Sequence, residues 1–264
     1  MAGLAAGKTP GAPALQAGEA LDDKHIVDLL IEERCEHLRA SPFWPAMRAF
    51  LYPLLRHRDA VRMADAIAEL PARGVFDYMS GFLELDVVTH GAEHIPSEGP
   101  VIIASTHPTG IPDGIAMYDV VRRVREDLIY FANRDAIRVN PQLADMLIPV
   151  EWVAAKRTRE RSRETLVSAA AAFEGERCVI LFPSGRIAYL DEKGAQTEQP
   201  WLASVAIFAR KYKCPIVPAH MAARNSPLYY WFWKLNNELR DITLFHELLN
   251  KRRKRFEIWF GPAI

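Results

Sequence analysis

A histidine and an aspartate stand six positions apart in residues 105–114, STHPTGIPDG, where an apolar run ends in a turn. Residues 101–104 have the composition of a buried strand, and Pro112 and Asp113 suit the first turn of a helix. The pair therefore follows the carboxyl end of a strand, where open α/β sheets bind ligands. His107 can accept a proton near neutral pH, since an unperturbed histidine has a pKa of about 6.5. Asp113 could orient that ring and stabilise its charged form, as the acid of a hydrolase triad does.

A purely structural interpretation of the same two residues is also open. His107 could simply end the strand, and Asp113 could stabilise the positive end of the helix that follows. Residues six positions apart do not share one helical face. Contact between the two side chains therefore requires the bend that Pro108, Gly110 and Pro112 can impose.

Other predicted strands also end in residues suited to binding. Residues 182–186 read Phe-Pro-Ser-Gly-Arg, a turn that offers backbone N–H groups and the Arg186 guanidinium. Another strand ends at Arg134, and residues 215–218 form a proline-bounded apolar turn. His220, in apolar surroundings, is interpreted as a near-core histidine. Ser184 is a weak candidate nucleophile, because Pro-Ser-Gly lacks the G-x-S-x-G elbow and serine is common in turns.

The elements around these residues alternate between short β-rich runs and helix-length segments. Apolar runs predict strands at residues 85–89, 101–105, 128–132, 148–153, 178–182, 216–218 and 256–259. Helix-length segments lie at 113–125, 159–174 and 201–212, and this alternation favours an α/β fold with a mostly parallel central sheet flanked by helices. Helical periodicity in residues 21–84 predicts an N-terminal helical cap, and residues 1–20 are interpreted as a disordered tail. The predicted α/β domain spans residues 85–264.

Composition limits the classes of partner and compartment. The 33 basic and 33 acidic residues among 264 cancel, so net charge gives no reason to expect nucleic acid. Cys35, Cys178 and Cys214 are far apart and surrounded by apolar residues, which favours reduced buried thiols and a cytoplasmic protein. No apolar stretch approaches the roughly 18 residues of a membrane span, and no ligand spacing predicts a metal site.

Taken together, the strand ends resemble the glycerolipid acyltransferase superfamily, which includes lysophosphatidic acid acyltransferases. His107 and Asp113 match its first motif, Arg134 its second, Phe182 to Gly185 its third, and residues 215–218 its fourth. The motif H-P-x-G-x-x-D-G at residues 107–114 and the segment E-L-L-N-K-R at residues 247–252 most resemble sequences of the bacterial hemolysin-like branch. This branch includes ornithine-lipid N-acyltransferases. The resemblance runs from about Phe76 to the last residue.

Two departures separate this chain from the best-known members of the superfamily. Those members have four residues between the histidine and the aspartate, whereas this chain has five. They also have glutamate at the position of Ser184. The spacing points away from the glycerol phosphate enzymes and towards the hemolysin-like branch, and the serine weakens the case for a glycerol phosphate acceptor bound as in those members.

The resemblance implies direct acyl transfer, with His107 as the base and Asp113 as its orienting partner. It implies no cofactor, and acyl-CoA or an acyl carrier protein as co-substrate, with a lipid-like acceptor acylated on oxygen or nitrogen. Arg134, Ser184, Gly185 and Arg186 would bind substrate, and N–H groups at Gly110 and Gly185 would stabilise the oxyanion. A hydrolase and a non-catalytic lipid-binding protein on the same fold remain alternatives.

Two clusters suggest where donor and membrane would bind. Residues 156–163 carry five positive charges, and Lys156, Arg157 and Arg159 are candidate donor-binding residues, with a solvated helix start as the alternative. Residues 228–234 are dense in aromatic side chains and precede a second basic run at 251–255. This combination suggests a peripheral protein on the inner face of the cell membrane, although an aromatic core helix would have the same sequence.

Overall fold

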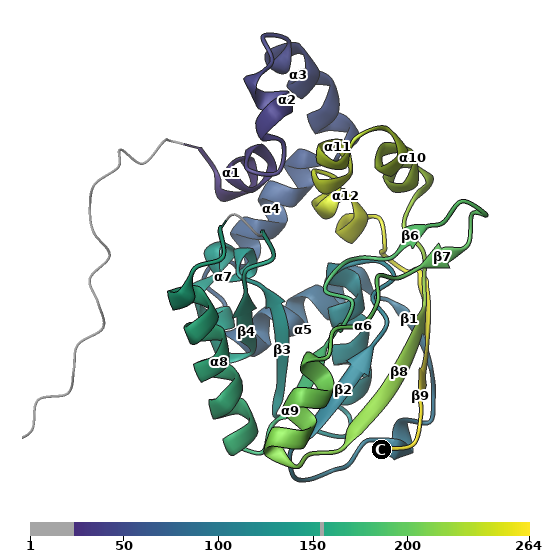
Figure 1. Cartoon of the computed structure of the whole chain (residues 1–264). Coiled ribbons are helices and arrows are strands. Elements are labelled where there is room, and N and C mark those ends of the chain that lie inside the picture. The colour runs from purple at the N-terminus through teal and green to yellow at the C-terminus, as the bar shows by residue number, and fades with distance from the viewer. Residues whose placement is uncertain (1–23, 154–155) are drawn as a thin grey trace, which may run out of the picture.

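A mostly parallel sheet forms the centre of the computed structural model, which describes residues 24–153 and 156–264 (Figure 1). Within these ranges the sheet has seven strands in the order β1-β9-β8-β2-β5-β3-β4. The strands are β1 (Asp86–His90), β2 (Val101–Ser105), β3 (Leu128–Asn133), β4 (Leu147–Val150), β5 (Cys178–Leu181), β8 (Ile216–Ala222) and β9 (Arg255–Phe260). They are the seven runs that the sequence predicts, with ends that differ by up to four residues. The predicted α/β class is confirmed.

One pair of neighbouring strands, β8 and β9, is antiparallel. The chain leaves β8 at the carboxyl end of the sheet, forms three helices there, and returns through β9 from that same end. A small hairpin of β6 (Tyr189–Leu190) and β7 (Gln196–Thr197) stands outside the main sheet. Neither feature was predicted, because hydrophobic patterns identify strands but not their direction.

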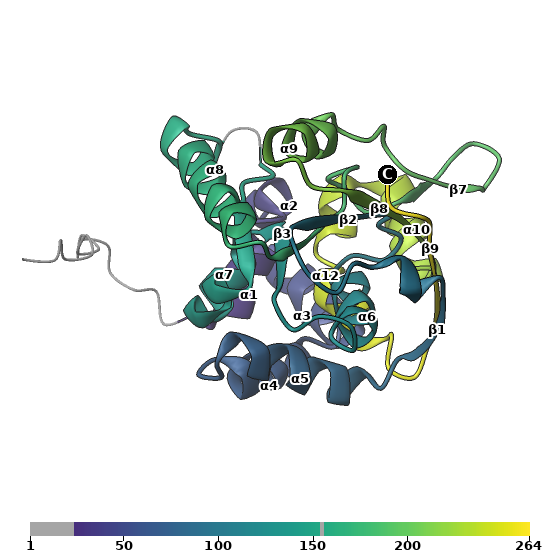
Figure 2. The same ribbon diagram turned by 90° about the horizontal axis from the view of Figure 1, so that it is seen from below.

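Helices cover both faces of the sheet, and Figure 2 shows these layers from below. The helices are α1 (Ile26–Glu32), α2 (Glu36–Ala40), α3 (Trp44–Leu54), α4 (His57–Ile67), α5 (Ala72–Leu83), α6 (Ile111–Val121), α7 (Asp135–Val139), α8 (Arg159–Glu174), α9 (Ser204–Tyr212), α10 (Pro227–Leu235), α11 (Asn237–Asp241) and α12 (Leu244–Leu249), with 3-10 turns η1 (Ala92–His94) and η2 (Pro141–Asp145). Alternate residues of β2 point to opposite faces. Val101 and Ile103 join the core under α5 and α6, whereas Ile102 and Ala104 join the core under α8 and α9.

The N-terminal helical segment shares the core of the α/β part. Helix α5 packs against α6, and Phe76 of α5 stacks on Tyr130 of β3 with ring centroids 5.1 Å apart. Helices α1–α3 lie above the carboxyl end of the sheet, so the predicted cap stands over the edge that carries His107 (Figure 1). The predicted tail, residues 1–20, lies outside the described residues.

The three cysteines are buried and unpaired, as predicted. Burial raises the pKa of both Cys35 and Cys178 to about 12, so neither thiol ionises readily. His220, by contrast, is exposed and stacks on Trp259, so the prediction of a near-core histidine is wrong. Side chains alternate between the two faces of a strand, and His220 lies on the outward face of β8, between the buried Ala219 and Met221.

The described residues contain neither a membrane-spanning helix nor a metal-binding cluster. None of their helices is long and apolar enough to cross a bilayer. No group of three or more His, Cys, Asp or Glu residues among them is arranged to hold a metal ion.

Candidate active site

The turn after β2 is organised by the buried carboxylate of Asp113. Its Oδ2 accepts hydrogen bonds from the backbone N–H groups of Thr109 (2.8 Å) and Gly110 (3.0 Å), and its Oδ1 accepts one from the Thr109 hydroxyl. Gly110 is the N-cap of α6 and has φ +98°, a conformation that favours glycine. A Cβ at Gly110 would also lie 2.7 Å from Ile187. The tight turn that the sequence requires is therefore built around Asp113.

His107 and Asp113 meet across this turn. His107 Nδ1 lies 2.9 Å from Asp113 Oδ2. The distance is that of an ion pair, but this buried nitrogen has no hydrogen-bond partner. The Asp113 side chain is fully buried, and that of His107 is 19% exposed. Asp113 therefore caps α6 and also faces the histidine, and its catalytic role stays a prediction.

The segment that follows β5 encloses His107 from a second side. The Phe182 ring stacks on the imidazole with centroids 4.2 Å apart. The Ala188 N–H donates to the His107 carbonyl at 2.9 Å. His107 of the first motif and Phe182 of the third, 75 residues apart in the chain, are therefore in direct contact, because β2 and β5 are parallel neighbours.

The three polar candidates of the third motif lie in different surroundings. Ser184 is buried and its hydroxyl donates to the Arg186 carbonyl at 2.9 Å, whereas Gly185 and Arg186 are exposed. The Gly185 N–H donates to the Phe182 carbonyl at 3.0 Å, and the Gly110 N–H donates to Asp113. Both candidate oxyanion donors are therefore engaged within the chain. Their role stays a prediction, and it requires the turn to release one of them.

Arg134 lies on the same edge of the sheet, at the end of β3. Strand β5 separates β3 from β2, the strand that leads to His107. The ends of β3 and β2 are therefore two strand spacings, roughly 10 Å, apart. Its guanidinium binds Glu164 of α8 with Nη2 and Oε2 2.5 Å apart, while its buried Nε has no hydrogen-bond partner. The structure thus places His107, the turn at 182–186 and Arg134 in one row along the carboxyl edge of the sheet.

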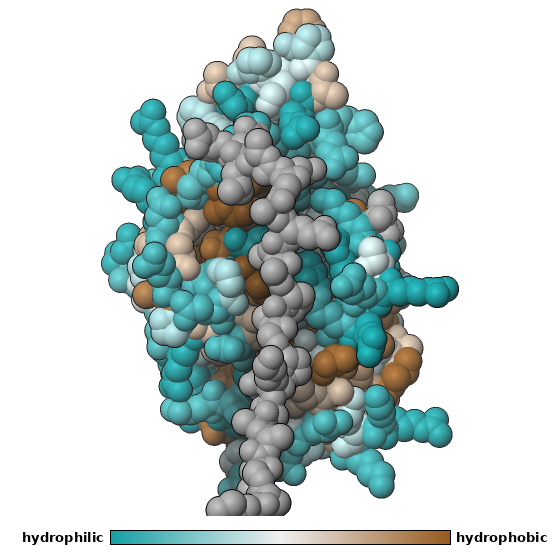
Figure 3. Space-filling view, turned by 90° about the vertical axis from the view of Figure 1, so that its left-hand side faces the viewer, coloured by the Kyte–Doolittle hydropathy of each residue, from teal (hydrophilic) through white to brown (hydrophobic). Residues whose placement is uncertain are grey.

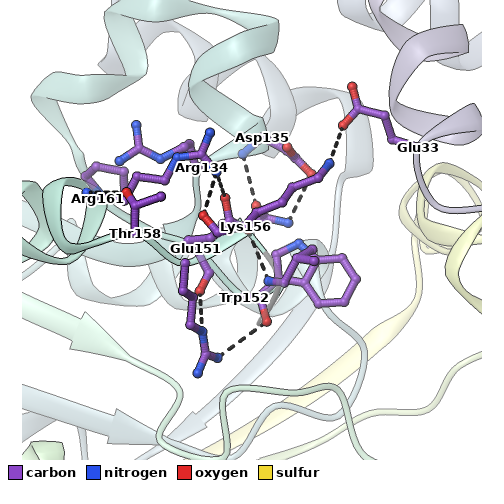
Figure 4. A network of polar contacts seen from close by, with 12 residues as sticks. Glu33, Arg134, Asp135, Glu151, Trp152, Lys156, Thr158 and Arg161 are labelled. Carbon is purple, nitrogen blue, oxygen red and sulfur yellow. Dashed lines mark hydrogen bonds and ion pairs between the residues drawn. The ribbon is translucent and has the colours of Figure 1, made fainter.

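A basic pocket of about 360 Å³ lies at the Arg134 end of this row, between the N-terminal helices and the strand ends (Figure 4). Its lining holds five basic and three acidic side chains together with Trp152 and Val153: Arg34, Arg134, Arg138, Lys156, Arg161, Glu33, Asp135 and Glu151. In Figure 4, Lys156 reaches Glu33 and Arg161 reaches Glu151, at 3.1 and 2.6 Å. Five positive and three negative charges leave the lining with an excess of positive charge.

The candidate donor-binding residues divide between this pocket and the surface. Lys156 lines the pocket. Arg157 is exposed, and its guanidinium donates to the backbone carbonyls of Glu151 (3.0 Å) and Trp152 (3.4 Å). Arg159 is exposed in the first turn of α8. Only the first of the three is therefore placed directly in the pocket.

Glu33 provides a pH-dependent link between the N-terminal helices and this pocket. Hydrogen bonds from Arg138, and then from Lys156, lower its pKa to about 2 against the opposing effect of burial. The ionised form stabilises the fold, so this contribution is complete above the ordinary pKa near 4.5 and declines as pH falls towards 2. We expect the melting temperature of the wild type to exceed that of Glu33→Gln at pH 7, by a margin that shrinks between pH 4.5 and 3. A margin that stays constant with pH would contradict this assignment.

Some residues of the site carry no motif in the sequence. Glu198, in the loop after β7, accepts hydrogen bonds from the His107 backbone N–H and, at 2.9 Å, from the Trp201 indole. Asn225, after β8, is 6% exposed, and neither polar atom of its side chain has a hydrogen-bond partner. A lone glutamate and a lone asparagine in loops give no sequence signal, so only the fold reveals them.

Comparisons with known proteins show the family of the chain. The family model described as Acyltransferase matches residues 86–222, from β1 to the end of β8. Two lyso-glycine lipid O-acyltransferases, from Bacteroides thetaiotaomicron and Phocaeicola vulgatus, are 25% and 26% identical over 189 and 190 residues. Each alignment covers 69% of this chain, and 67% and 66% of those proteins.

Among solved structures, the 1-acyl-sn-glycerophosphate acyltransferase of Thermotoga maritima superposes with a TM-score of 0.46 at 14% identity, covering 90% of this chain and 86% of that one. The family match spans more than half of the chain and contains both His107 and Asp113. The chain belongs to the acyltransferase family.

Proposed function

We propose that this acyltransferase moves a fatty acyl group from a thioester to a hydroxyl of a lysolipid-like acceptor, with His107 as the general base. The observation that carries the mechanism is the 2.9 Å contact between His107 Nδ1 and the buried Asp113 carboxylate. The names of the two lyso-glycine lipid O-acyltransferases support a lysolipid acceptor and acylation on oxygen. The first motif resembles that of the hemolysin-like branch, and this branch also includes N-acyltransferases. An amine acceptor is therefore the competing outcome.

The proposed reaction uses the ring nitrogen that Asp113 does not face. His107 Nε2 takes the proton of the acceptor hydroxyl as its oxygen attacks the thioester carbonyl carbon. The new C–O bond forms, the tetrahedral oxyanion collapses, and the C–S bond breaks. The departing thiolate then takes the proton back from His107, which leaves an ester and a free thiol. Asp113 stabilises the imidazolium in between.

The basic pocket at Arg134 is proposed to bind the anionic end of a substrate. Its excess of positive charge suits a phosphate, such as those of acyl-CoA or of the prosthetic group of an acyl carrier protein. Lys156 would contact that group, and Arg157 and Arg159 would attract it from the surface. Ser184, Gly185 and Arg186 lie between this pocket and His107 along the edge of the sheet, where the acyl and acceptor groups would meet.

An acyl-transfer assay tests the proposed function against hydrolysis. We expect thiol release from long-chain acyl-CoA, or from acyl carrier protein, to require a lysolipid acceptor and to yield the acylated lipid. Parallel reactions with hydroxyl-bearing and amine-bearing lysolipids, analysed by mass spectrometry, identify the acylated atom. Release of free fatty acid at the same rate without any acceptor would instead identify a hydrolase.

Membrane docking is proposed through the end of the molecule above the carboxyl edge of the sheet, on the inner face of the cell membrane. Phe43 and Phe50, at and within α3, are each 72% exposed, and Trp231 and Leu235 of α10 are 57% and 56% exposed. Helices α3 and α10 both lie at the upper end of Figure 1. The upper tip carries hydrophobic residues among hydrophilic ones on the face shown in Figure 3. Aromatic side chains of this kind favour the interface of a bilayer.

Replacing Phe50 by aspartate is expected to weaken binding to anionic phospholipid vesicles by roughly tenfold, because an apolar side chain is lost from the interface and a charge is introduced. Leu166→Asp is the matched control, since Leu166 is 57% exposed on α8, away from that end. Vesicle co-sedimentation measures both. Equal binding by the two variants would contradict docking through α3.

A further inference from the structure

A buried ion pair lies behind the active-site turn, in the segment E-L-L-N-K-R at residues 247–252. Lys251 is 3% exposed and Glu247 is 2% exposed. The Lys251 ammonium donates to Glu247 Oε2 at 2.8 Å, to the Glu247 carbonyl at 3.2 Å and to Asn250 Oδ1 at 2.8 Å. All three donors of the ammonium therefore have acceptors, and the proposed chemistry so far makes no use of the pair.

The contacts of Lys251 with Glu247 are those of a buried ion pair. Burial lowers the pKa of Lys251, against the opposing effect of Glu247 and Asp113. Burial works to raise the pKa of Glu247, but Lys251 and the bonds from Ser226 lower it below its ordinary value. Buried ion pairs stabilise a fold poorly compared with apolar residues of similar size. A role beyond stability would explain why two charges are placed here.

The carboxylate of Glu247 holds the turn that follows β8. It accepts the Ser226 backbone N–H at 2.8 Å and the Ser226 hydroxyl at 2.5 Å. The adjacent Asn225 N–H donates to the Tyr230 hydroxyl at 3.3 Å. This turn therefore depends directly on Glu247.

Gln196 continues the chain of contacts to the histidine. Its side-chain amide donates to the Tyr230 hydroxyl at 3.4 Å and to the Pro108 carbonyl at 3.3 Å. Pro108 directly follows His107. Hydrogen bonds, together with the peptide link between Asn225 and Ser226, thus connect the Glu247–Lys251 pair to the backbone beside the proposed base.

The ammonium charge also acts on Asp113 through space. Helix α12, which carries Glu247, packs against α6, which carries Asp113 in its first turn. The charges of Lys251 and Asp113 interact favourably.

We propose that Glu247 and Lys251 are positioning residues: they fix the turn at 225–226 and place a buried ammonium beside Asp113, and so determine the pH range in which His107 acts as a base. This inference rests on the proposed function, since it assumes that His107 accepts the proton. Neither residue is required to touch the substrate. Other ionisable or charged groups face this cluster or His107 from the neighbouring elements: Arg56, Glu198, Tyr230, His246 and Lys254.

The pH profile of kcat/KM for Lys251→Met tests the proposal. Its acid limb reports the ionisation of the base in the free enzyme. Removal of the positive charge makes the imidazolium easier to form, so the limb is expected to move to higher pH by about half to one unit. Lys251→Arg keeps the charge and should retain the wild-type limb. An unmoved limb in Lys251→Met, with only a lower rate or melting temperature, would show that the pair has a packing role alone.

Asp127→Asn is the matched control for loss of a buried ion pair. Arg125, 6% exposed, binds Asp127 at the start of β3, on the opposite edge of the sheet from His107. This variant is expected to lower the melting temperature and leave the acid limb in place. A limb that moved equally in Asp127→Asn would overturn the proposal, because the shift would then follow from destabilisation.

A double variant covers the case in which Lys251→Met does not fold because Glu247 is left unpaired. Glu247→Gln with Lys251→Met removes both charges, which is better tolerated than removal of one. The acid limb of kcat/KM is again expected at a higher pH than in the wild type, by a smaller shift. An acid limb at the same pH as in the wild type would overturn the inference. Failure of the proposed function is recognised separately, since His107→Ala would then keep its activity.

Discussion

His107→Ala is expected to lower kcat/KM for acyl transfer by roughly two to four orders of magnitude, with little change in the melting temperature. The acceptor hydroxyl would lose its proton acceptor, and no other histidine contacts the Asp113 carboxylate among the described residues. The side chain is 19% exposed, so its truncation removes a ring at the surface of the turn and leaves the sheet intact. Steady-state rates of thiol release with a lysolipid acceptor measure the effect.

His220→Ala is the matched control for loss of an imidazole. His220 stands on β8, the parallel neighbour of β2, but its exposed ring stacks on Trp259. We expect its kcat/KM within about twofold of the wild type, as for surface substitutions away from the site. Comparable losses in the two variants would rule out His107 as the specific base.

Asp113→Asn is expected to reduce kcat by roughly 10²- to 10⁴-fold, because the imidazole would lose the charge that orients it and stabilises its protonated form. The amide also has one oxygen where the carboxylate has two acceptors. Its NH₂ group would face either the N–H groups of Thr109 and Gly110 or the Thr109 hydroxyl. An unsatisfied buried group of this kind costs about 1–3 kcal/mol, so the melting temperature should fall as well.

Asp119→Asn separates the catalytic effect from the loss of stability. Asp119 is a buried carboxylate on the same helix, and it accepts a hydrogen bond from the Ser80 hydroxyl at 2.5 Å. This variant should be destabilised but should transfer acyl groups at a rate near that of the wild type. If Asp113→Asn were no less active than Asp119→Asn at a temperature where both are folded, Asp113 would have a capping role only.

The strands and their polar ends were predictable because short apolar runs and turn residues act over only a few positions of the sequence. Each strand of the main sheet is a short apolar run, and β2 is buried along its whole length. The turn after β2 needs proline, glycine and aspartate at particular positions, and these residues are visible in the sequence as such. Local propensity therefore located both His107 and Asp113 at the carboxyl end of a strand.

Contacts between distant segments were not predictable in the same way. Glu198 lies 91 residues after His107 and accepts its backbone N–H. Glu247 and Lys251 were visible only as part of a characteristic ending, with no indication that they are buried behind the active-site turn. The free N–H groups expected at Gly110 and Gly185 are bonded within the chain, since a tight turn uses its own donors.

The sequence by itself determined the α/β class, the strand ends that carry polar residues, and the pair at 107 and 113, because apolar runs and turn residues act over a few positions. Tertiary structure alone decided that His107 and Asp113 lie 2.9 Å apart, that Phe182 stacks on the imidazole, and that the Glu247–Lys251 pair stands behind them. Strand order and direction set these contacts. They depend on the burial of whole faces of the sheet, which no short stretch of the chain encodes.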